Sequence, residues 1–266
     1  MQFLTTAEGR IAYEVWGSGP LVVMGPGMGD LRTTWRFTVP ALLGAGFRVA
    51  TFDLRGHGES DTTFTSYDDL AAASDMIALV EHLGAPAVLV GNSMSAGAAV
   101  WAASERPELV SALALVGPFV RQPKLNPVVA LAMRILTAPP WARRAWGAYL
   151  PTLYAGVQPP DLPAYLASVQ AAMALPGHAR AFSRTSRTSH RPIEPRVSTI
   201  TVPALVVMGD SDPDFAKPAD EAQWIRDTLH GELLMVPQSG HYPHAQRPDI
   251  VNPVLVDFVT RATRNA

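Results

Sequence analysis

Short apolar runs alternate along the chain with longer segments in which apolar residues recur at helical spacing. The short runs are rich in β-branched residues, which favours strands. They lie at residues 11–17, 21–25, 48–54, 87–92 and 110–117. The later runs are apolar at nearly every position, as is typical of parallel strands that helices cover on both faces.

The segments between these runs predict helices. Residues 68–83 carry apolar side chains at helical spacing, and Gly84 marks the expected end of that helix. A second helix is expected over 95–105, because the residue before a proline disfavours helical backbone and Pro107 follows. The alternation resumes late, with strands at 204–209 and 232–236 and helices at 220–229 and 249–263. This order predicts an α/β fold with a doubly wound, mostly parallel sheet.

Residues 119–200 break the alternation. This segment contains 11 of the 24 prolines and predicts several short helices separated by turns. The expected helices lie at 127–136, 140–150, 162–174 and 177–185. An insertion of helices between two strands predicts a lid over residues 119–200, on a core domain formed by 1–118 and 201–266.

The first candidate for chemistry is a turn of small residues between a predicted strand and a predicted helix. Residues 91–95 read Gly-Asn-Ser-Met-Ser. Such a turn lifts a serine hydroxyl above the sheet at a helix N-terminus, where negative charge is stabilised. We therefore expect Ser93 to be a nucleophile, the alternative being a simple helix cap. Ser95 stands where glycine is usual in this type of turn.

A serine nucleophile needs a base, and the base needs an acid that orients it. Residues 209–214 read Gly-Asp-Ser-Asp-Pro-Asp, and residues 239–244 read Ser-Gly-His-Tyr-Pro-His. Each segment follows a predicted parallel strand, at the end where open α/β sheets place their ligands. The chain therefore offers a serine, an acid and a histidine in that order.

In these motifs the sequence resembles the α/β-hydrolase-fold family of serine hydrolases over almost its full length. The resemblance implies that Ser93 is the nucleophile, that Asp212 in a G-x-x-D segment is the acid, and that His241 in Gly-His-x-Pro is the base. Residues 53–60 match the structural D-x-R-G-x-G-x-S turn of the family.

Other residues near these motifs admit further interpretations. Asp210 and Asp214 are alternatives to Asp212 as the acid. His244 is expected to pack or cap rather than act as a second base, and His57 is expected to bond the backbone of its glycine-rich loop.

The resemblance also implies an oxyanion hole made of two backbone N–H groups. Met94 follows the nucleophile and is expected to supply one donor. Met28, in the loop Gly-Pro-Gly-Met-Gly-Asp at 25–30, is expected to supply the other. Relatives usually carry His-Gly where this chain has Pro26-Gly27. Because the donor is a backbone group, the replacement of that histidine leaves the predicted hole intact.

Two further segments bear on the subgroup and the substrate. Residues 91–96 and 116–118 are similar to a subgroup that contains plant strigolactone/karrikin receptors and bacterial stress-signalling hydrolases, which carry a four-helix lid over an apolar pocket. Aromatic residues of the predicted lid are candidate substrate contacts: Trp141, Trp146, Tyr149 and Tyr154.

The function predicted from these residues is hydrolysis of a carboxylic ester or lactone of a small, largely apolar substrate through an acyl-enzyme. The same fold and triad also serve other reactions, because function depends on the pocket. The alternatives that stay open are C–C bond hydrolysis, perhydrolysis, lyase or cyclase chemistry, and ligand sensing by a slow hydrolase.

The amino-acid composition excludes several classes of site and of binding partner. The 266 residues include no cysteine, which excludes disulfides, cysteine–zinc sites and a cysteine nucleophile. A net charge of −2 gives no general attraction to nucleic acid. The start of the chain shows no secretory signal, and no run of apolar residues is long enough to span a bilayer. We expect a cytoplasmic protein with a small-molecule substrate and no cofactor. We also expect no metal, since no pair of histidines has metal-ligand spacing with a partner carboxylate. No protein partner is indicated.

The near-neutral total charge conceals an asymmetry. Residues 119–200 contain ten Lys and Arg against two Asp and Glu, a balance of +8, which leaves 11 against 21 elsewhere, a balance of −10. In one interpretation a basic lid rests on an acidic core. In the other, lid arginines such as Arg184 and Arg187 attract anionic substrates to the mouth of the site.

Overall fold

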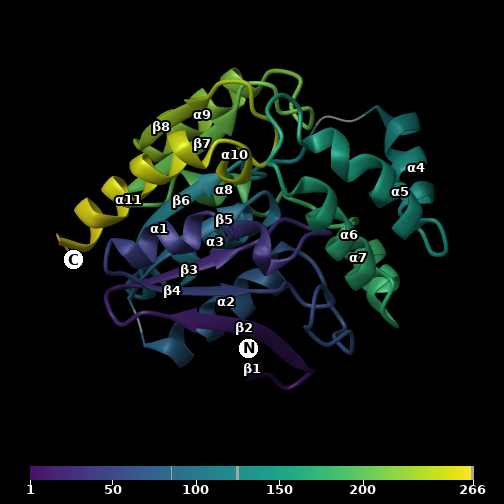
Figure 1. Ribbon diagram of the computed structural model, residues 1–266, viewed down its shortest axis with the longest axis horizontal. Coiled ribbons are helices and arrows are strands. Elements are labelled where there is room, and N and C mark those ends of the chain that lie inside the picture. Colours follow the sequence, from purple (N-terminus) through teal and green to yellow (C-terminus); the bar gives the residue numbers. More distant parts are fainter. Residues whose placement is uncertain (85, 124–125, 265–266) are drawn as a thin grey trace.

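A computed structural model describes residues 1–84, 86–123 and 126–264. In these residues eight strands form one sheet, in the order β1-β2-β4-β3-β5-β6-β7-β8 (Figure 1). The strands are β1 (Gln2–Thr5), β2 (Arg10–Trp16), β3 (Leu21–Gly25), β4 (Arg48–Phe52), β5 (Ala87–Asn92), β6 (Val110–Val116), β7 (Ala204–Gly209) and β8 (Glu232–Val236). The pairs of β2 with β1 and β4 are antiparallel, and the other pairs are parallel. The predicted fold class is therefore confirmed.

Helices cover both faces of the sheet. They are α1 (Thr38–Gly44), α2 (Asp69–Leu83), α3 (Met94–Glu105), α4 (Pro127–Leu136), α5 (Ala142–Tyr149), α6 (Leu162–Met173), α7 (His178–Thr185), α8 (Glu194–Val197), α9 (Pro218–Leu229), α10 (Pro243–Gln246) and α11 (Pro248–Arg264). None of those in the described part of the chain is both long and apolar enough to cross a membrane.

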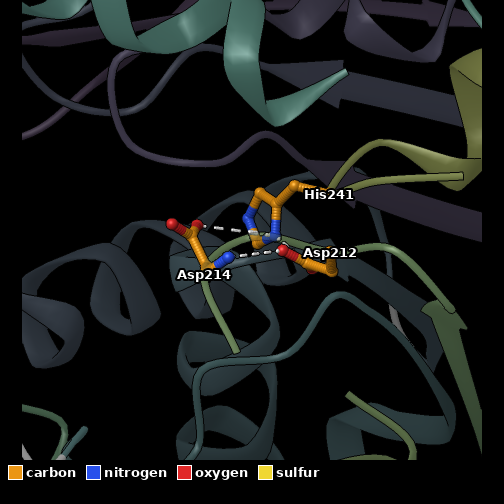
Figure 2. A group of neighbouring side chains, drawn as sticks. All are labelled: Asp212, Asp214 and His241. Atoms are coloured by element: carbon orange, nitrogen blue, oxygen red, sulfur yellow. Dashed lines mark hydrogen bonds and ion pairs between the residues drawn. The ribbon is translucent and has the colours of Figure 1, made fainter. Parts of the chain in front are cut away.

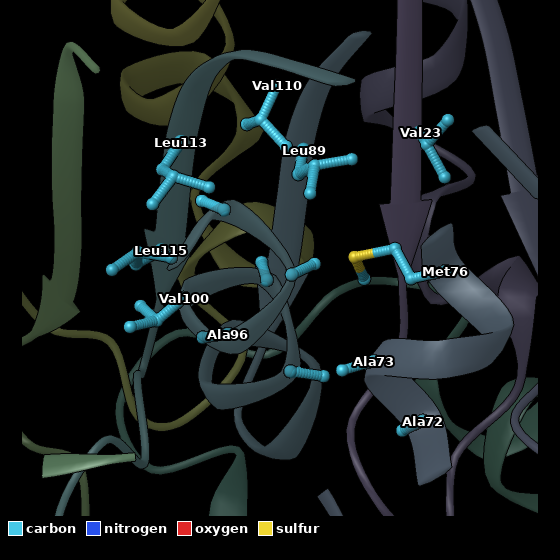
Figure 3. Close-up of a cluster of buried hydrophobic side chains, with 14 of the residues drawn as sticks. Val23, Ala72, Ala73, Met76, Leu89, Ala96, Val100, Val110, Leu113 and Leu115 are labelled. Carbon is cyan, nitrogen blue, oxygen red and sulfur yellow. The ribbon is translucent and has the colours of Figure 1, made fainter. Parts of the chain in front are cut away.

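The central strands are apolar on both faces because each face meets a different layer of helices. Val23 and Leu89 pack with α2 and α3 on one face, as Figure 3 shows for Met76 and Ala96. Their neighbours along the same strands, such as Val22, pack on the other face with α1 and α11. Successive side chains of a strand point to opposite faces, so an almost unbroken apolar run fills both layers.

Helices α4 to α7, here called the lid helices, lie together beside the main domain (Figure 1). Helices α5, α6 and α7 share a hydrophobic cluster that includes Trp146, Tyr165 and Phe182. The indole N–H of Trp146 donates to the carbonyl oxygen of Gly29 at 2.7 Å. Since Gly29 lies in the loop after β3, the lid helices rest directly on the loop that the sequence assigns to the oxyanion hole.

Helix α8 packs with the core rather than with the lid helices. Ile193, Val197 and Ile200 belong to the apolar cluster that contains α2 and α3. The interval 119–200, predicted as lid, therefore includes at its end a segment whose side chains complete the core domain.

Candidate active site

Ser93 lies at the turn between β5 and α3, in backbone that non-glycine residues rarely adopt. Its φ is +56° and its ψ is −117°. The turn is tight: a Cβ at Gly91 would lie 2.3 Å from the carbonyl oxygen of Ser95. Only glycine is tolerated at that approach, which explains the run of small residues in the motif. Strained backbone of this kind is characteristic of functional sites.

His241 is held in one orientation by several elements. Its Nδ1–H donates to Oδ2 of Asp212 at 2.7 Å, and both side chains are buried. Its backbone N–H donates to Leu153 at 2.8 Å, and its carbonyl oxygen accepts from the Asn92 amide at 3.2 Å. The structure thus pairs the predicted base with the predicted acid, 29 positions apart in the sequence.

Asp214 is a second carboxylate beside the same imidazole (Figure 2). Its Oδ2 lies 3.6 Å from Nδ1 of His241, and its backbone N–H donates to Oδ1 of Asp212 at 3.0 Å. The hydroxyl of Tyr149, at the end of α5, donates to Oδ1 of Asp214. Asp210, the other alternative, is exposed and accepts from the Ser211 hydroxyl. Asp212 is therefore the carboxylate in hydrogen-bond contact with the base.

The charges around His241 determine its protonation. Burial alone would lower its pKa, but the carboxylates of Asp212 and Asp214 outweigh that effect and raise the pKa of His241 to about 9. Burial also raises the pKa of Asp214. The imidazolium form of His241 is thus strongly stabilised, as a general base requires at the transition state.

Ser93 and His241 line the same cavity, of about 590 Å³. No hydrogen bond joins Ser93 Oγ to His241 among the described residues. Catalytic hydrogen bonds are often long without substrate and shorten in the complex. The two side chains are therefore brought to one cavity, and attack requires their final approach.

The predicted oxyanion donors lie on the two segments that border Ser93. Met94 is the first residue of α3, and Met28 lies in the loop after β3. Apart from hydrogen bonds internal to helices and strands, none among the described residues uses either backbone N–H. A Cβ at Gly27 would lie 3.1 Å from Cβ of Ser93, so this loop approaches the nucleophile closely.

The two departures from the usual family pattern contact each other. The hydroxyl of Ser95 donates to the carbonyl oxygen of Pro26 at 2.5 Å, and both groups are buried. Pro26 stands where a histidine is usual and Ser95 where a glycine is usual. The extra hydroxyl thus ties the start of α3 to the loop that carries Met28.

The aromatic residues proposed as substrate contacts separate into two groups. Trp146 and Tyr149 line the cavity, together with Phe119 and Met133. Trp141 is 53% exposed and does not line the cavity. Tyr154 is buried with its ring stacked on Tyr242 at 4.6 Å, and it does not line the cavity either. In this structure Trp141 and Tyr154 therefore lie outside the cavity wall, which sequence spacing could not show, and their role as substrate contacts stays a prediction.

A second pair of histidine and aspartate, not predicted from the sequence, reaches the same cavity. Nδ1 of His190 lies 2.7 Å from Oδ2 of Asp69, and both side chains are buried. Asp69 begins α2, whereas His190 follows α7, 121 positions later. No motif joins the two residues, and a polar side chain in a turn is ordinarily exposed, so the sequence carried no signal for this pair.

The remaining histidines near the motifs have structural contacts. His57 Nδ1 lies 3.0 Å from the carbonyl oxygen of Arg55. His244 is buried against the ring of Trp35, with Nε2 3.0 Å from the Thr34 hydroxyl. Burial lowers the pKa of His57 to about 4, and it holds the pKa of His244 well below its usual range. Both therefore act as neutral packing groups near pH 7.

Asp212, Asp214 and His241 also place one potential metal ligand each within 4.8 Å of one another. The Nδ1 atom of His241 is engaged by Asp212, so a cation bound at Nδ1 would have to replace the bond that orients the base. The donor set is better suited to holding a proton than to holding a metal, and our expectation of no metal stays a prediction.

Comparison with known proteins places this geometry in context. Residues 22–254 match the model of the alpha/beta hydrolase family. A Mycobacterium tuberculosis protein of uncharacterised activity is 39% identical over 117 residues, which are 44% of this chain and 34% of that protein. The chain thus matches about a third of the length of that relative.

Other relatives match over nearly their full length. A Mycobacterium tuberculosis protein named a non-heme bromoperoxidase is 31% identical over 94% of this chain and 97% of its own. The 2-(acetamidomethylene)succinate hydrolase of Mesorhizobium japonicum is 28% identical to this chain, and the match covers 94% of this chain and 92% of the hydrolase. The solved structure of the enol-lactonase of Burkholderia xenovorans has the same fold, with a TM-score of 0.83. The two sequences are 22% identical, and the match covers 97% of this chain and all of the enol-lactonase chain.

Proposed function

Because this chain belongs to the alpha/beta hydrolase family, we propose that it is a serine hydrolase that cleaves a carboxylic ester or lactone through an acyl-enzyme. One observation carries the proposal: Ser93, at a strained strand-to-helix turn, shares a cavity with His241, whose Nδ1–H is bonded to Asp212. A serine, a base and an orienting acid in this order are the requirements of nucleophilic acyl transfer.

Acylation begins when Oγ of Ser93 attacks the carbonyl carbon of the substrate. Nε2 of His241 accepts the hydroxyl proton, and the carbonyl electron pair moves onto oxygen. The backbone N–H groups of Met28 and Met94 hold that oxyanion. The oxyanion then collapses, the bond to the leaving oxygen breaks, and His241 returns the proton to the leaving alkoxide.

Deacylation repeats the sequence with water. His241 takes a proton from a water molecule as its oxygen attacks the acyl-enzyme, and it then gives the proton to Ser93 Oγ as the acid leaves. Both steps need an unprotonated Nε2 at the start. Since the pKa of His241 is raised to about 9, the rate is expected to rise with pH through the neutral range.

The cavity favours a small substrate with a substantial apolar part. About 590 Å³ lies in the usual range for small-molecule sites. Its wall combines the catalytic residues with apolar and aromatic side chains, such as Leu136, Trp146 and Phe182. All three come from the lid helices, so the lid is expected to shape the acyl or alcohol side of the site.

The experiment is turnover of p-nitrophenyl butyrate by the purified chain and by Ser93→Ala. We expect Ser93→Ala to lose at least roughly 10³-fold in kcat, since removing the nucleophile removes the acyl-enzyme route. The matched control is Ser104→Ala on the same helix, because that hydroxyl does not line the cavity: it donates to the carbonyl oxygen of Trp101 and accepts from Arg196 at 3.3 Å. Retained turnover in Ser93→Ala would refute the proposal. A fluorophosphonate adduct mapped to Ser93 in the wild type would independently support it.

Perhydrolysis is a second candidate, favoured by the relative named a non-heme bromoperoxidase. In this reaction hydrogen peroxide replaces water as the acceptor of the acyl group, and a peracid leaves instead of an acid. Bromide oxidation by the wild type in acetate and hydrogen peroxide, absent in Ser93→Ala, would support this use of the site. Acyl-ester turnover without bromide oxidation would leave hydrolysis as the activity.

A further inference from the structure

Part of the cavity wall is polar and basic, and the proposed chemistry does not use it. The turn after α7 contributes Ser186, Arg187, Thr188 and His190 to this wall. Gln122 faces the same cavity. These side chains provide hydrogen bonding and positive charge in a site that is otherwise largely apolar.

The side chain of His190 is buried in this wall of the cavity. It is 4% exposed, and its Nδ1 lies 2.7 Å from the carboxylate of Asp69. Its backbone N–H donates to Gln122 at 3.0 Å, and the hydroxyl of Thr188 accepts from the backbone N–H of Asp69 at 3.1 Å. These bonds hold the turn that carries His190 against the first residue of α2, and they fix the orientation of the imidazole ring.

The free nitrogen of His190 is available to a ligand. Nε2 has no hydrogen-bond partner in the described part of the chain, although the residue is buried and lines the cavity. The ring of Phe119 packs on His190 at 5.3 Å and on His241 at 5.8 Å between ring centres. A substrate that reaches Ser93 and His241 can therefore extend past Phe119 to His190.

Positive charge at this wall is not neutralised by the protein. Two lid-segment arginines pair with core carboxylates at 2.5 Å, Arg121 with Glu221 and Arg196 with Glu105. Arg187 forms no ion pair within the residues that the structure describes. It lies three positions before His190 in the same turn. An arginine fork and an imidazole with a free nitrogen at one wall suit the two oxygens of a carboxylate.

We propose that Arg187 and His190 bind a carboxylate of the substrate while its scissile carbonyl lies at Ser93. This inference rests on the proposed function, and it assigns the substrate class as esters or lactones that carry a second, free carboxylate. Asp69 orients His190 and balances its charge when Nε2 carries a proton and donates to the substrate. The asymmetry between a basic lid segment and an acidic core then serves recognition at one defined wall.

The experiment compares two substrates of equal chain length, p-nitrophenyl hexanoate and mono-p-nitrophenyl adipate, which differ by a terminal carboxylate. The wild type is expected to turn over the adipate ester with a kcat/KM at least about tenfold higher. Arg187→Gln and His190→Gln should each lower that preference roughly tenfold or more, as expected for loss of a charge-assisted hydrogen bond. The preference is the ratio of the two kcat/KM values, so a loss of activity common to both esters does not change it.

Arg184→Gln is the matched control, because it removes the same charge from the neighbouring helix. Arg184 lies over the ring of Tyr67 at 5.7 Å and does not line the cavity. Its substitution should leave the preference unchanged. An equal loss in Arg184→Gln and Arg187→Gln would overturn the subsite in favour of diffuse attraction, and no preference in the wild type would overturn it outright.

A binding measurement separates failure of the subsite from failure of the proposed function. If the wild type hydrolyses neither ester, the proposed function fails. The Ser93→Ala protein should still bind monomethyl adipate at least about tenfold more tightly than methyl hexanoate by calorimetry, and adding Arg187→Gln should abolish the difference. Equal binding of the two esters would overturn the subsite. Because Arg187 is exposed, its variant is expected to fold normally, which thermal unfolding checks.

Discussion

Replacing Asp214 with asparagine removes one of the two carboxylates that face Nδ1 of His241. The oxygen 3.6 Å from Nδ1 belongs to Asp214, and the oxygen 2.7 Å away belongs to Asp212. Asparagine keeps an oxygen that can accept from the Tyr149 hydroxyl, so the link between Asp214 and the lid survives. The substitution thus changes the charge beside the base while preserving its main hydrogen bond.

The size of the effect follows from the distance. At 3.6 Å two unit charges interact by about 1 kcal/mol in water and by about 4 to 5 kcal/mol at an effective dielectric constant of 20. One pKa unit corresponds to about 1.4 kcal/mol. Because Asp214 keeps some contact with solvent, we take the lower part of that range and expect the pKa of His241 to fall by at least about one unit.

The assay is the pH dependence of kcat/KM for p-nitrophenyl butyrate between about pH 6 and 10, which reports the base in the free enzyme. The proton must leave His241 before it can act, so activity rises with pH around the pKa. In the wild type this rise is expected near pH 9, where the carboxylates place the pKa of His241. In Asp214→Asn it should occur at least about one unit lower, with a corresponding gain in activity at pH 7.

Asp210→Asn is the control, since Asp210 is an exposed carboxylate on the same loop that bonds Ser211 rather than the base. It should leave the midpoint within about 0.3 units of the wild type, the range expected for a screened surface charge. Coincident midpoints in the wild type and Asp214→Asn would refute the electrostatic reasoning. So would an equal shift in Asp210→Asn.

Two further predictions concern the loop beside Ser93 and the potential metal ligands. Ser95→Ala should lower the free energy of unfolding by about 1 to 3 kcal/mol, measured by urea denaturation, because the buried carbonyl oxygen of Pro26 loses its donor. Ser95→Ala should also lower kcat for butyrate ester turnover, because the loop with Met28 loosens. An unchanged free energy of unfolding in Ser95→Ala would contradict the prediction. Dialysis against EDTA should leave that turnover unchanged, whereas loss that zinc restores would show that Asp212, Asp214 and His241 hold a cation.

Much of the fold could be predicted because its signals are local. The strand at Leu21–Gly25 and the strand at Ala87–Asn92 have the bounds that their apolar runs predict. Elements with weak local patterns were not predicted. Strand β1 has one buried residue, Leu4, and α8 is a single turn whose apolar residues lie within a proline-containing segment. Their structure depends on packing against distant parts of the chain.

The candidate site shows the same division. A turn of small residues identified Ser93, and strand-end motifs identified Asp212 and His241, because each lies within a recognisable local segment. The motif favoured Asp212 but left Asp214 as an alternative, since both follow the same strand and the path of the loop decides which carboxylate reaches Nδ1.

The sequence by itself determined the alternation of central strands and helices, the resemblance to the family, and the residues of the expected nucleophile, acid and base. Only the tertiary structure decided which aromatic residues face the cavity, that Ser95 bonds Pro26, and that His190 meets Asp69. The physical reason is one of range. Periodicity and turn chemistry report a residue's neighbours within a few positions, whereas these contacts join parts of the chain that approach only after the sheet and the lid helices have packed.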